Sequence, residues 1–187
     1  MERVSHEQGM MGAGLPASII QVVDKAVTVA ATVIPILALV LLFLSLGAEV
    51  VVRYLTTQGL GWPSEMPNIL FPWLVMGGVV LAAQRGAHIA VTLLLEMMGR
   101  SGARVLLLVM QVVVAATFFY LAYIGLEVIE ITGAEVYPVT GISARWAYLS
   151  LIVGFFGVGI TAVTTFGRVL LADDPRLVRA DHPEDHA

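Results

Sequence analysis

The residues that could do chemistry in this chain are few, and they lie outside its long apolar runs. The four histidines, which could bind haem iron or move protons, are His6, His88, His182 and His186. A four-helix cytochrome would need facing histidines at membrane depth, and none of the four is placed there. The chain has no cysteine, which excludes disulfides, thiolate metal sites and cysteine nucleophiles. We therefore expect no catalytic residue, no metal site and no cofactor.

Acidic and basic side chains also avoid the apolar runs. Glu127, Glu130 and Glu135 follow one run as an acidic patch, where solvation is the expected role. Proton-coupled carriers need an ionisable group inside the membrane, and no Asp, Glu, Lys, Arg or His occupies the middle of a run. We also find no serine nucleophile with a base in reach, no paired carboxylates and no phosphate-binding glycine loop. These absences argue against an enzyme and against a small proton-coupled exporter.

The composition indicates what holds these few polar residues. The chain has 187 residues, of which 58% are hydrophobic and 13% charged, and its mean hydropathy is +0.89. A soluble domain carries roughly 25% charged residues. Because a transmembrane helix needs about 20 apolar residues, the chain has room for four or five spans and for no separate soluble domain. The net charge is -4 and there is no basic stripe, so we expect no nucleic-acid partner.

Four runs are apolar and long enough to cross a membrane. We predict an all-α integral membrane protein, a single membrane domain over residues 1–187, with spans at about 26–48, 65–84, 105–125 and 146–166. Pro35 and Pro72 should bend the first two spans. Residues 1–17 should form a flexible tail, and residues 168–187 a polar tail.

Small and polar residues inside the runs predict helix contacts. Gly77-Gly78 is a candidate close-packing point, and glycines 154, 157 and 159 give the last span a smooth face that favours helix contact over a ligand path. Gln111 interrupts the third span. We expect it to be hydrogen-bonded between helices rather than functional.

A shorter segment, residues 88–98, predicts an amphipathic helix at the membrane surface. His88, Thr92 and Glu96 recur at i, i+4 and i+8 and so form one narrow polar stripe. The remaining face is aliphatic or methionine and could lie in lipid or against a partner helix. With Arg85, these three side chains are the candidate membrane-interface residues, held by lipid headgroups or by loops of a partner.

The distribution of basic residues predicts the orientation. If the amino end is cytoplasmic, the outer side carries only Arg53 and Arg145, and the inner side carries Arg3, Lys25, Arg85, Arg100, Arg104, Arg168, Arg176 and Arg179. This positive-inside bias places both termini in the cytoplasm. Aromatic side chains that settle at an interface then gather at the outer boundary; they are Trp62, Tyr137, Trp146 and Tyr148.

The segment from Arg53 to Glu96 is the most distinctive part of the chain. It resembles the small membrane subunit (DctQ type) of tripartite ATP-independent periplasmic (TRAP) transporters. The residues that match that pattern in order and spacing are Arg53-Tyr54, Trp62, Glu65, Trp73, Gly78, Arg85-Gly86 and His88-Ile89. Two positions depart from it: Ser64 and Thr92 stand where the family often has acidic residues. These departures weaken any role that needs those charges and leave the four-span layout intact.

The resemblance implies a non-catalytic subunit of a sodium-coupled, binding-protein-dependent transporter for organic acids in the cytoplasmic (inner) membrane of a bacterium or archaeon. Its partners would be a large membrane subunit, whose fixed scaffold it braces, a periplasmic substrate-binding protein, and membrane lipids. The substrate stays open among four-carbon dicarboxylates, sialic acids and 2-oxo acids. The candidate partner-binding residues are Arg53, Trp62, Glu65, Trp73 and Gly78.

Within this set, two placements can be stated as hypotheses. Arg53 and Glu65 could pair at the outer boundary and shape the surface for the binding protein; otherwise they are an interfacial arginine and a glutamate at a helix start that Ser64 caps. Trp73 could pack on the large subunit or inside the bundle. Two other functions stay open: an independent small transporter, and a membrane anchor for a redox or signalling complex.

Overall fold

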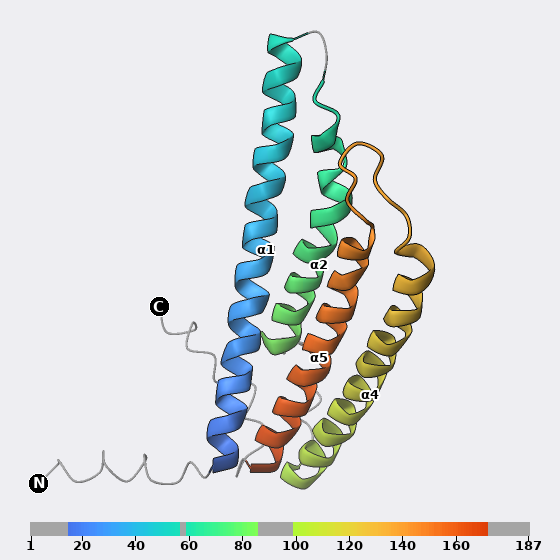
Figure 1. Ribbon diagram of the computed structural model, residues 1–187. Helices are drawn as coiled ribbons and strands as arrows, with labels where there is room; N and C mark the ends of the chain where they lie inside the picture. The colour runs from blue at the N-terminus through green and yellow to red at the C-terminus, as the bar shows by residue number, and fades with distance from the viewer. Residues whose placement is uncertain (1–14, 57–58, 86–98, 172–187) are drawn as a thin grey trace, which may run out of the picture.

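A computed structural model describes residues 15–56, 59–85 and 99–171 of the chain (Figure 1). The described ranges contain four long helices and one 3-10 turn, which are α1 (Leu15–Leu55), η1 (Trp62–Ser64), α2 (Met66–Arg85), α4 (Arg100–Thr132) and α5 (Arg145–Leu171). All four helices are long and apolar enough to cross a membrane. The predicted all-α fold, with four helices able to span a membrane, is therefore confirmed.

Some predictions lie outside the described residues. These are the surface helix at 88–98, with His88, Thr92 and Glu96, and most of the two predicted tails. The last three residues of the tail predicted at 1–17 belong to α1, which begins at Leu15.

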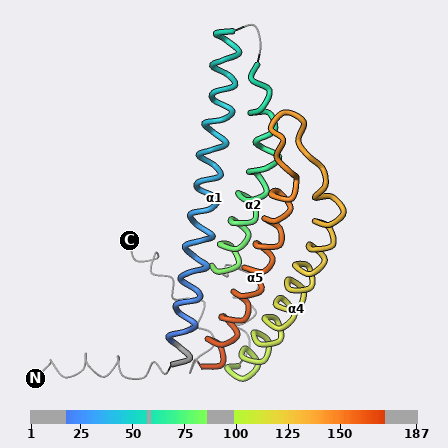
Figure 2. The backbone as a smooth tube through the Cα atoms, in the orientation of Figure 1, coloured from blue at the N-terminus to red at the C-terminus, as the bar shows by residue number. Residues whose placement is uncertain are grey.

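The four helices form a row in the order α1, α2, α5, α4 (Figure 1, Figure 2). The main contacts join α1 to α2, α2 to α5 and α5 to α4. Helix α5 lies inside this row and has more buried residues than any other helix in the described ranges. The core of the bundle is therefore built around α5.

Helix α1 is much longer than the span predicted at 26–48. It has 41 residues, so it is about 62 Å long at 1.5 Å per residue, about twice the thickness of the hydrocarbon core of a bilayer. Asp24 does not end the helix, because its carboxylate pairs with Arg168 of α5. Pro35 lies within the helix, and the end near Leu55 rises beyond the other helices in Figure 1.

Glycine allows the close approach of α1 and α2. A Cβ atom placed on Gly77 would lie 2.7 Å from Cγ and 2.8 Å from Cδ of the Pro35 ring. The neighbouring Gly78 has no atom within 4 Å of such a Cβ. The predicted packing point is therefore Gly77 alone, and Gly78 faces outward from this chain.

The glycines of α5 have the packing role that the sequence predicts. Gly154 lies opposite Met76 of α2, whose Cβ would be 2.8 Å from an added Cβ. Gly159 lies on the other side, where an added Cβ would be 2.8 Å from a ring carbon of Phe119 in α4. Helix α5 can thus approach both neighbours closely.

We predict that the adjacent glycines of α2 differ sharply in tolerance. Gly77→Ala should destabilise the chain by about 1–3 kcal/mol, because the rigid Pro35 ring cannot move aside for a methyl group. Gly78→Ala should be neutral or stabilise by up to about 1 kcal/mol, since alanine favours a helix. Denaturant unfolding in detergent micelles measures both. Equal stability of the two variants would contradict the close contact.

Candidate functional site

The candidate site lies at the end of the bundle where α1 joins α2 and α4 joins α5. We call this the Glu65 end. Glu65 directly precedes α2 and is the one buried acidic side chain in the described ranges, at 7% exposed. Its Oε1 accepts the N–H of Val139 at 3.0 Å, and its Oε2 accepts the N–H and the hydroxyl of Thr140, both at 2.8 Å. We call these three residues the Glu65 clasp.

The connection from α4 to α5 is folded so that it can present these amides. Val136 and Ser143 form an antiparallel bridge, and the N–H of Tyr137 donates to the carbonyl of Ile142 at 2.9 Å. Gly141 has φ 69°, a left-handed conformation that glycine adopts without strain. The resulting turn projects from the helix ends, and its tip meets Glu65.

The 3-10 turn η1, in the connection between α1 and α2, lies next to the clasp. Gly61 has φ 75°, and a Cβ there would contact Val139 at 3.5 Å. Ser64 does not cap α2 as expected, because its hydroxyl donates back to the carbonyl of Gly61 at 2.5 Å. Helix α2 therefore begins after a tight turn, with Glu65 directed to the opposite connection.

The predicted pairing of Arg53 with Glu65 is wrong for this chain. The Glu65 carboxylate is occupied by Val139 and Thr140, and no ion pair joins it to Arg53 in the part of the chain that the structure describes. Arg53 lies exposed in the last turn of α1. Another acid of α1 contacts the connection instead, since Glu49 accepts the N–H of Leu60 at 3.0 Å.

Large apolar side chains are exposed on the two connections at the Glu65 end and at the start of α5. They are Leu60, Trp62, Val136, Val139 and Trp146, each between 38% and 58% exposed. Burial, and then the negative charge of Glu135, raise the pKa of the Tyr137 phenol above its usual range. The Glu65 end therefore presents an apolar surface, and part of that surface lies on the α4–α5 connection that Glu65 holds in place.

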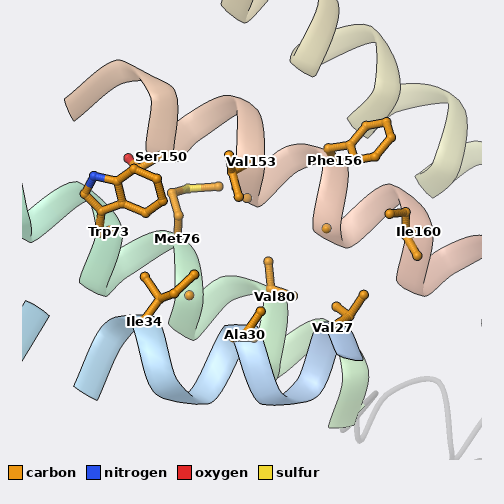
Figure 3. A pocket seen from close by; sticks show the side chains of 14 residues that line it. Val27, Ala30, Ile34, Trp73, Met76, Val80, Ser150, Val153, Phe156 and Ile160 are labelled. Carbon is orange, nitrogen blue, oxygen red and sulfur yellow. The ribbon is translucent and has the colours of Figure 1, made fainter. Parts of the chain in front are cut away.

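Trp73 is engaged within the chain. Its indole N–H donates to the carbonyl of Trp146 at 2.9 Å and so links α2 to α5. Figure 3 shows its ring at one end of an apolar groove between α1, α2 and α5, with Ile34 and Met76 beside it. The groove has a volume of about 200 Å³. Of the two placements left open for Trp73, the structure favours packing inside the bundle.

Gly78 lies on an exposed face of α2. The exposed residues along that face are Asn68, Phe71, Val75, Gly78, Val79, Ala82 and Arg85. Their spacing follows one side of a helix. A partner-binding role for Gly78, as for Arg53 and Trp62, stays a prediction.

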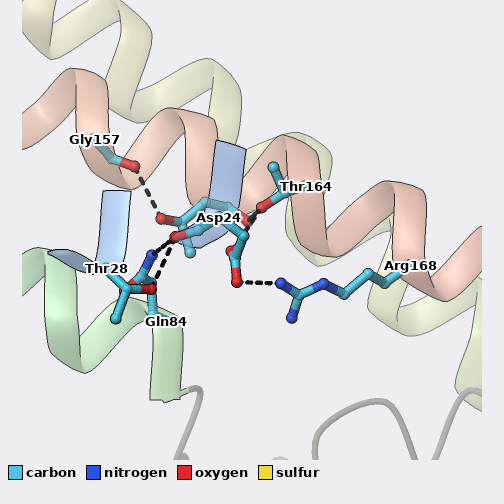
Figure 4. A network of polar contacts seen from close by, with 7 residues as sticks. Asp24, Thr28, Gln84, Gly157, Thr164 and Arg168 are labelled. Atoms are coloured by element: carbon cyan, nitrogen blue, oxygen red, sulfur yellow. Dashed lines mark hydrogen bonds and ion pairs between the residues drawn. The ribbon is translucent and has the colours of Figure 1, made fainter. Parts of the chain in front are cut away.

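A polar cluster at the opposite end was not predicted from the sequence. Asp24 of α1 pairs with Arg168 of α5, and its Oδ1 accepts the Thr164 hydroxyl at 3.4 Å (Figure 4). Its carbonyl accepts the Thr28 hydroxyl at 2.8 Å and the Gln84 amide of α2 at 3.4 Å. These five residues are the Asp24 cluster. It ties three helices together where the sequence indicated only a boundary charge.

The described residues at the two ends serve to hold helices and turns in place. Among the described residues, no group of three or more His, Cys, Asp or Glu side chains could hold a metal ion. The Glu65 carboxylate is saturated by hydrogen bonds from its own chain, which suits a structural role. The arrangement can hold the helix ends in place and leave the exposed apolar surface of the Glu65 end in a fixed shape.

We predict that Glu65→Ala frees the α4–α5 connection without unfolding the helices. A hydrogen bond to a charged group contributes about 1.5–3 kcal/mol, so exchange of the Val139 and Thr140 amide hydrogens should accelerate by at least about tenfold. Hydrogen-exchange mass spectrometry of the purified chain measures this. Glu135→Ala, which removes an exposed acid from the same connection, is the control. Unchanged exchange in Glu65→Ala would show that the clasp does not hold the turn.

Comparisons with known proteins agree with this architecture. A protein from Sinorhizobium fredii called "Uncharacterized protein y4mM" is 33% identical over 156 residues, covering 82% of this chain but only 29% of that protein. The chain thus spans less than a third of the length of that relative. A "Putative TRAP transporter small permease protein" from Haemophilus influenzae is 27% identical over 118 residues, which is 63% of this chain and 72% of that protein.

A further relative and a family model cover most of the chain. The "Ectoine TRAP transporter small permease protein TeaB" of Halomonas elongata is 24% identical over 163 residues, 86% of this chain and 84% of that protein. The model described as "Tripartite ATP-independent periplasmic transporters, DctQ component" matches residues 42–172. That range contains α2, the Glu65 clasp, α4 and α5. The chain therefore belongs to the DctQ family, the small permease subunits of TRAP transporters.

Proposed function

We propose that this chain is the non-catalytic small membrane subunit of a sodium-coupled, binding-protein-dependent transporter for organic acids. Subunits of this family work with a large membrane subunit and a periplasmic binding protein. The observation that carries the proposal is the family match over residues 42–172. In this proposal the chain lies in the cytoplasmic membrane of a bacterium or archaeon and braces the fixed scaffold of the large subunit.

The outer surface of α1 supports a role beside another membrane protein. Large apolar side chains are exposed along much of its length, and Phe43 and Leu55 are 76% and 79% exposed. The helix is also longer than a bilayer core is thick. The hydrocarbon core of a bilayer covers only part of such a helix when the helix stands upright. The rest must contact a protein partner, or the helix must tilt so that more of it lies in the core.

The exposed face of α2 is our candidate contact for the large subunit. Gly78 and Ala82 are small residues at i and i+4, a spacing that lets helices approach closely in membranes. Within this chain nothing lies within 4 Å of a Cβ on Gly78. Close packing there is therefore left for a helix of another chain.

The apolar surface around the Glu65 clasp is our candidate receiver for the binding protein. Trp62 and Val139 are exposed on turns that Glu65 holds in place, and Arg53 adds a positive charge nearby in sequence and at the same end of the bundle. At the opposite end, Arg85 closes α2. We assign it, with His88, Thr92 and Glu96, to contact with lipid headgroups.

Co-expression with a large membrane subunit of a TRAP transporter tests the pairing. The unmodified chain should co-purify with that subunit in mild detergent. Gly78→Leu should reduce recovery of the large subunit by about fivefold or more, since overpacking a helix contact costs about 1–3 kcal/mol. Because Gly78 has open space in the chain itself, the variant should still fold.

Ala116→Leu is the matched control, since Ala116 is a small, exposed residue of α4, away from the proposed contacts of α1 and α2. It should co-purify normally if the α2 face is the contact. Failure of the unmodified chain to bind any large membrane subunit would sink the proposed function. Uptake of solute by this chain alone in liposomes, or a redox enzyme among its partners, would replace it with another.

We further predict that both termini are cytoplasmic. The chain has no cysteine, so a single introduced thiol reports its own side of the membrane. Ala134→Cys, at the Glu65 end, should react with a membrane-impermeant maleimide in spheroplasts. Ser101→Cys, at the exposed start of α4, should react only after the membrane is opened. The reverse pattern would mean the opposite orientation.

A further inference from the structure

We infer that a cavity between α2, α4 and α5 is a water-binding site, in which ordered water bridges Gln111 of α4 to Thr161 and Thr165 of α5. The inference concerns the interior of the bundle and does not depend on the transport role. It starts from one mostly buried side chain that makes no hydrogen bond with the described part of the chain.

Gln111 is the buried group that needs explaining. It is 5% exposed and lies on α4, the last helix of the row. We expected a hydrogen bond from it to another helix, but it takes part in no side-chain hydrogen bond within residues 15–56, 59–85 and 99–171. An amide buried without hydrogen bonds costs about 1–3 kcal/mol in a protein. Inside a bilayer no bulk water is at hand to relieve that cost.

Gln111 lines a cavity large enough to hold water. Its volume is about 90 Å³, and its walls come from α2 at Ala83, from α4 and from α5. A water molecule needs a cavity of roughly 10–15 Å³ measured in this way. Several water molecules therefore fit, whereas a larger organic ligand does not.

The polar groups around this cavity match what water requires. Gln111 offers two N–H donors and a carbonyl acceptor. The Thr161 hydroxyl donates to the carbonyl of Gly157 at 3.0 Å and keeps its oxygen free to accept. Thr165 also lines the cavity, and its hydroxyl has no partner among the described residues. A buried water molecule typically makes about three hydrogen bonds, and these groups supply them from two helices.

The apolar groove beside Trp73 shows by contrast why this cavity is suited to water. The groove beside Trp73 is lined almost wholly by apolar side chains such as Ile34, Met76 and Val80 (Figure 3). Apolar cavities stay dry, whereas polar ones are hydrated. Water at Gln111 would add a polar link between α4 and α5 to the apolar contacts of Gly159 and Phe119.

Nuclear magnetic resonance of the purified chain in micelles tests the site directly. With selectively ¹⁵N-labelled glutamine, the side-chain amide protons of Gln111 should show magnetisation transfer from water, and Gln111→Leu identifies their signals by loss. Thr165→Val, which removes a hydroxyl and keeps the shape, should shift these signals and weaken the transfer. Thr117→Val, the same change on the exposed face of α4, should leave them unchanged. Absence of transfer at Gln111, or equal effects of the two threonine variants, would overturn the inference.

Thermal unfolding gives an independent readout. If water hydrogen-bonds the Gln111 amide, Gln111→Leu leaves the bound water molecules without those hydrogen bonds. The midpoint of thermal unfolding should then fall by about 2–4 °C for a chain of this size. If the cavity is dry, the same variant removes an unsatisfied amide and raises the midpoint. An unchanged or raised midpoint would therefore count against the bound water, because it would show that the amide contributes nothing to stability.

Discussion

The structure depends above all on how closely α5 can approach the helices on either side of it. Inside a bilayer there is no hydrophobic drive that pushes helices together, because lipid tails are as apolar as leucine. Attraction must come from atoms in contact. Gly154 and Gly159 of α5 remove side chains where Met76 and Phe119 arrive, and Gly77 does the same for the ring of Pro35 between α1 and α2. The row α1–α2–α5–α4 is the arrangement in which these contacts are made together.

Polar interactions then fix the two ends of the bundle, where its helices begin and end. At one end the buried carboxylate of Glu65 holds the α4–α5 turn by three hydrogen bonds. At the other end Asp24 joins α1 to Arg168 of α5 and, through its carbonyl, to Gln84 of α2. The ion pair is partly exposed, with the two side chains 39% and 23% accessible, so its contribution is small and its value lies in fixing register. Helices that pack through glycine can slide, and interactions at both ends oppose sliding.

The sequence predicted the elements better than the contacts between them. Four apolar runs are a local signal, and so is the smooth glycine face of α5; both were found. The predicted first span starts too late, because the charge of Asp24 marks the limit of the apolar run. A charged residue ends a span only when it must reach water, and here Arg168 pairs with Asp24 instead. Glu65 was identified as a key residue but given the wrong partner, since Val139 lies 74 positions away and donates a backbone N–H. A backbone donor leaves no trace in residue type, so no local pattern could have named it.

The bracing role that we propose requires a chain that is stiff along its length and adhesive on its outside, and these requirements favour opposite choices of sequence. Stiffness needs small residues turned inward, as at Gly77, whereas adhesion needs small or apolar residues turned outward, as at Gly78. Adjacent positions on one helix meet both needs here because successive side chains are about 100° apart. The pair Gly77-Gly78 thus serves two different surfaces. A substitution at either position acts on one surface only. The effects on internal packing and on assembly can therefore be measured separately within one helix turn.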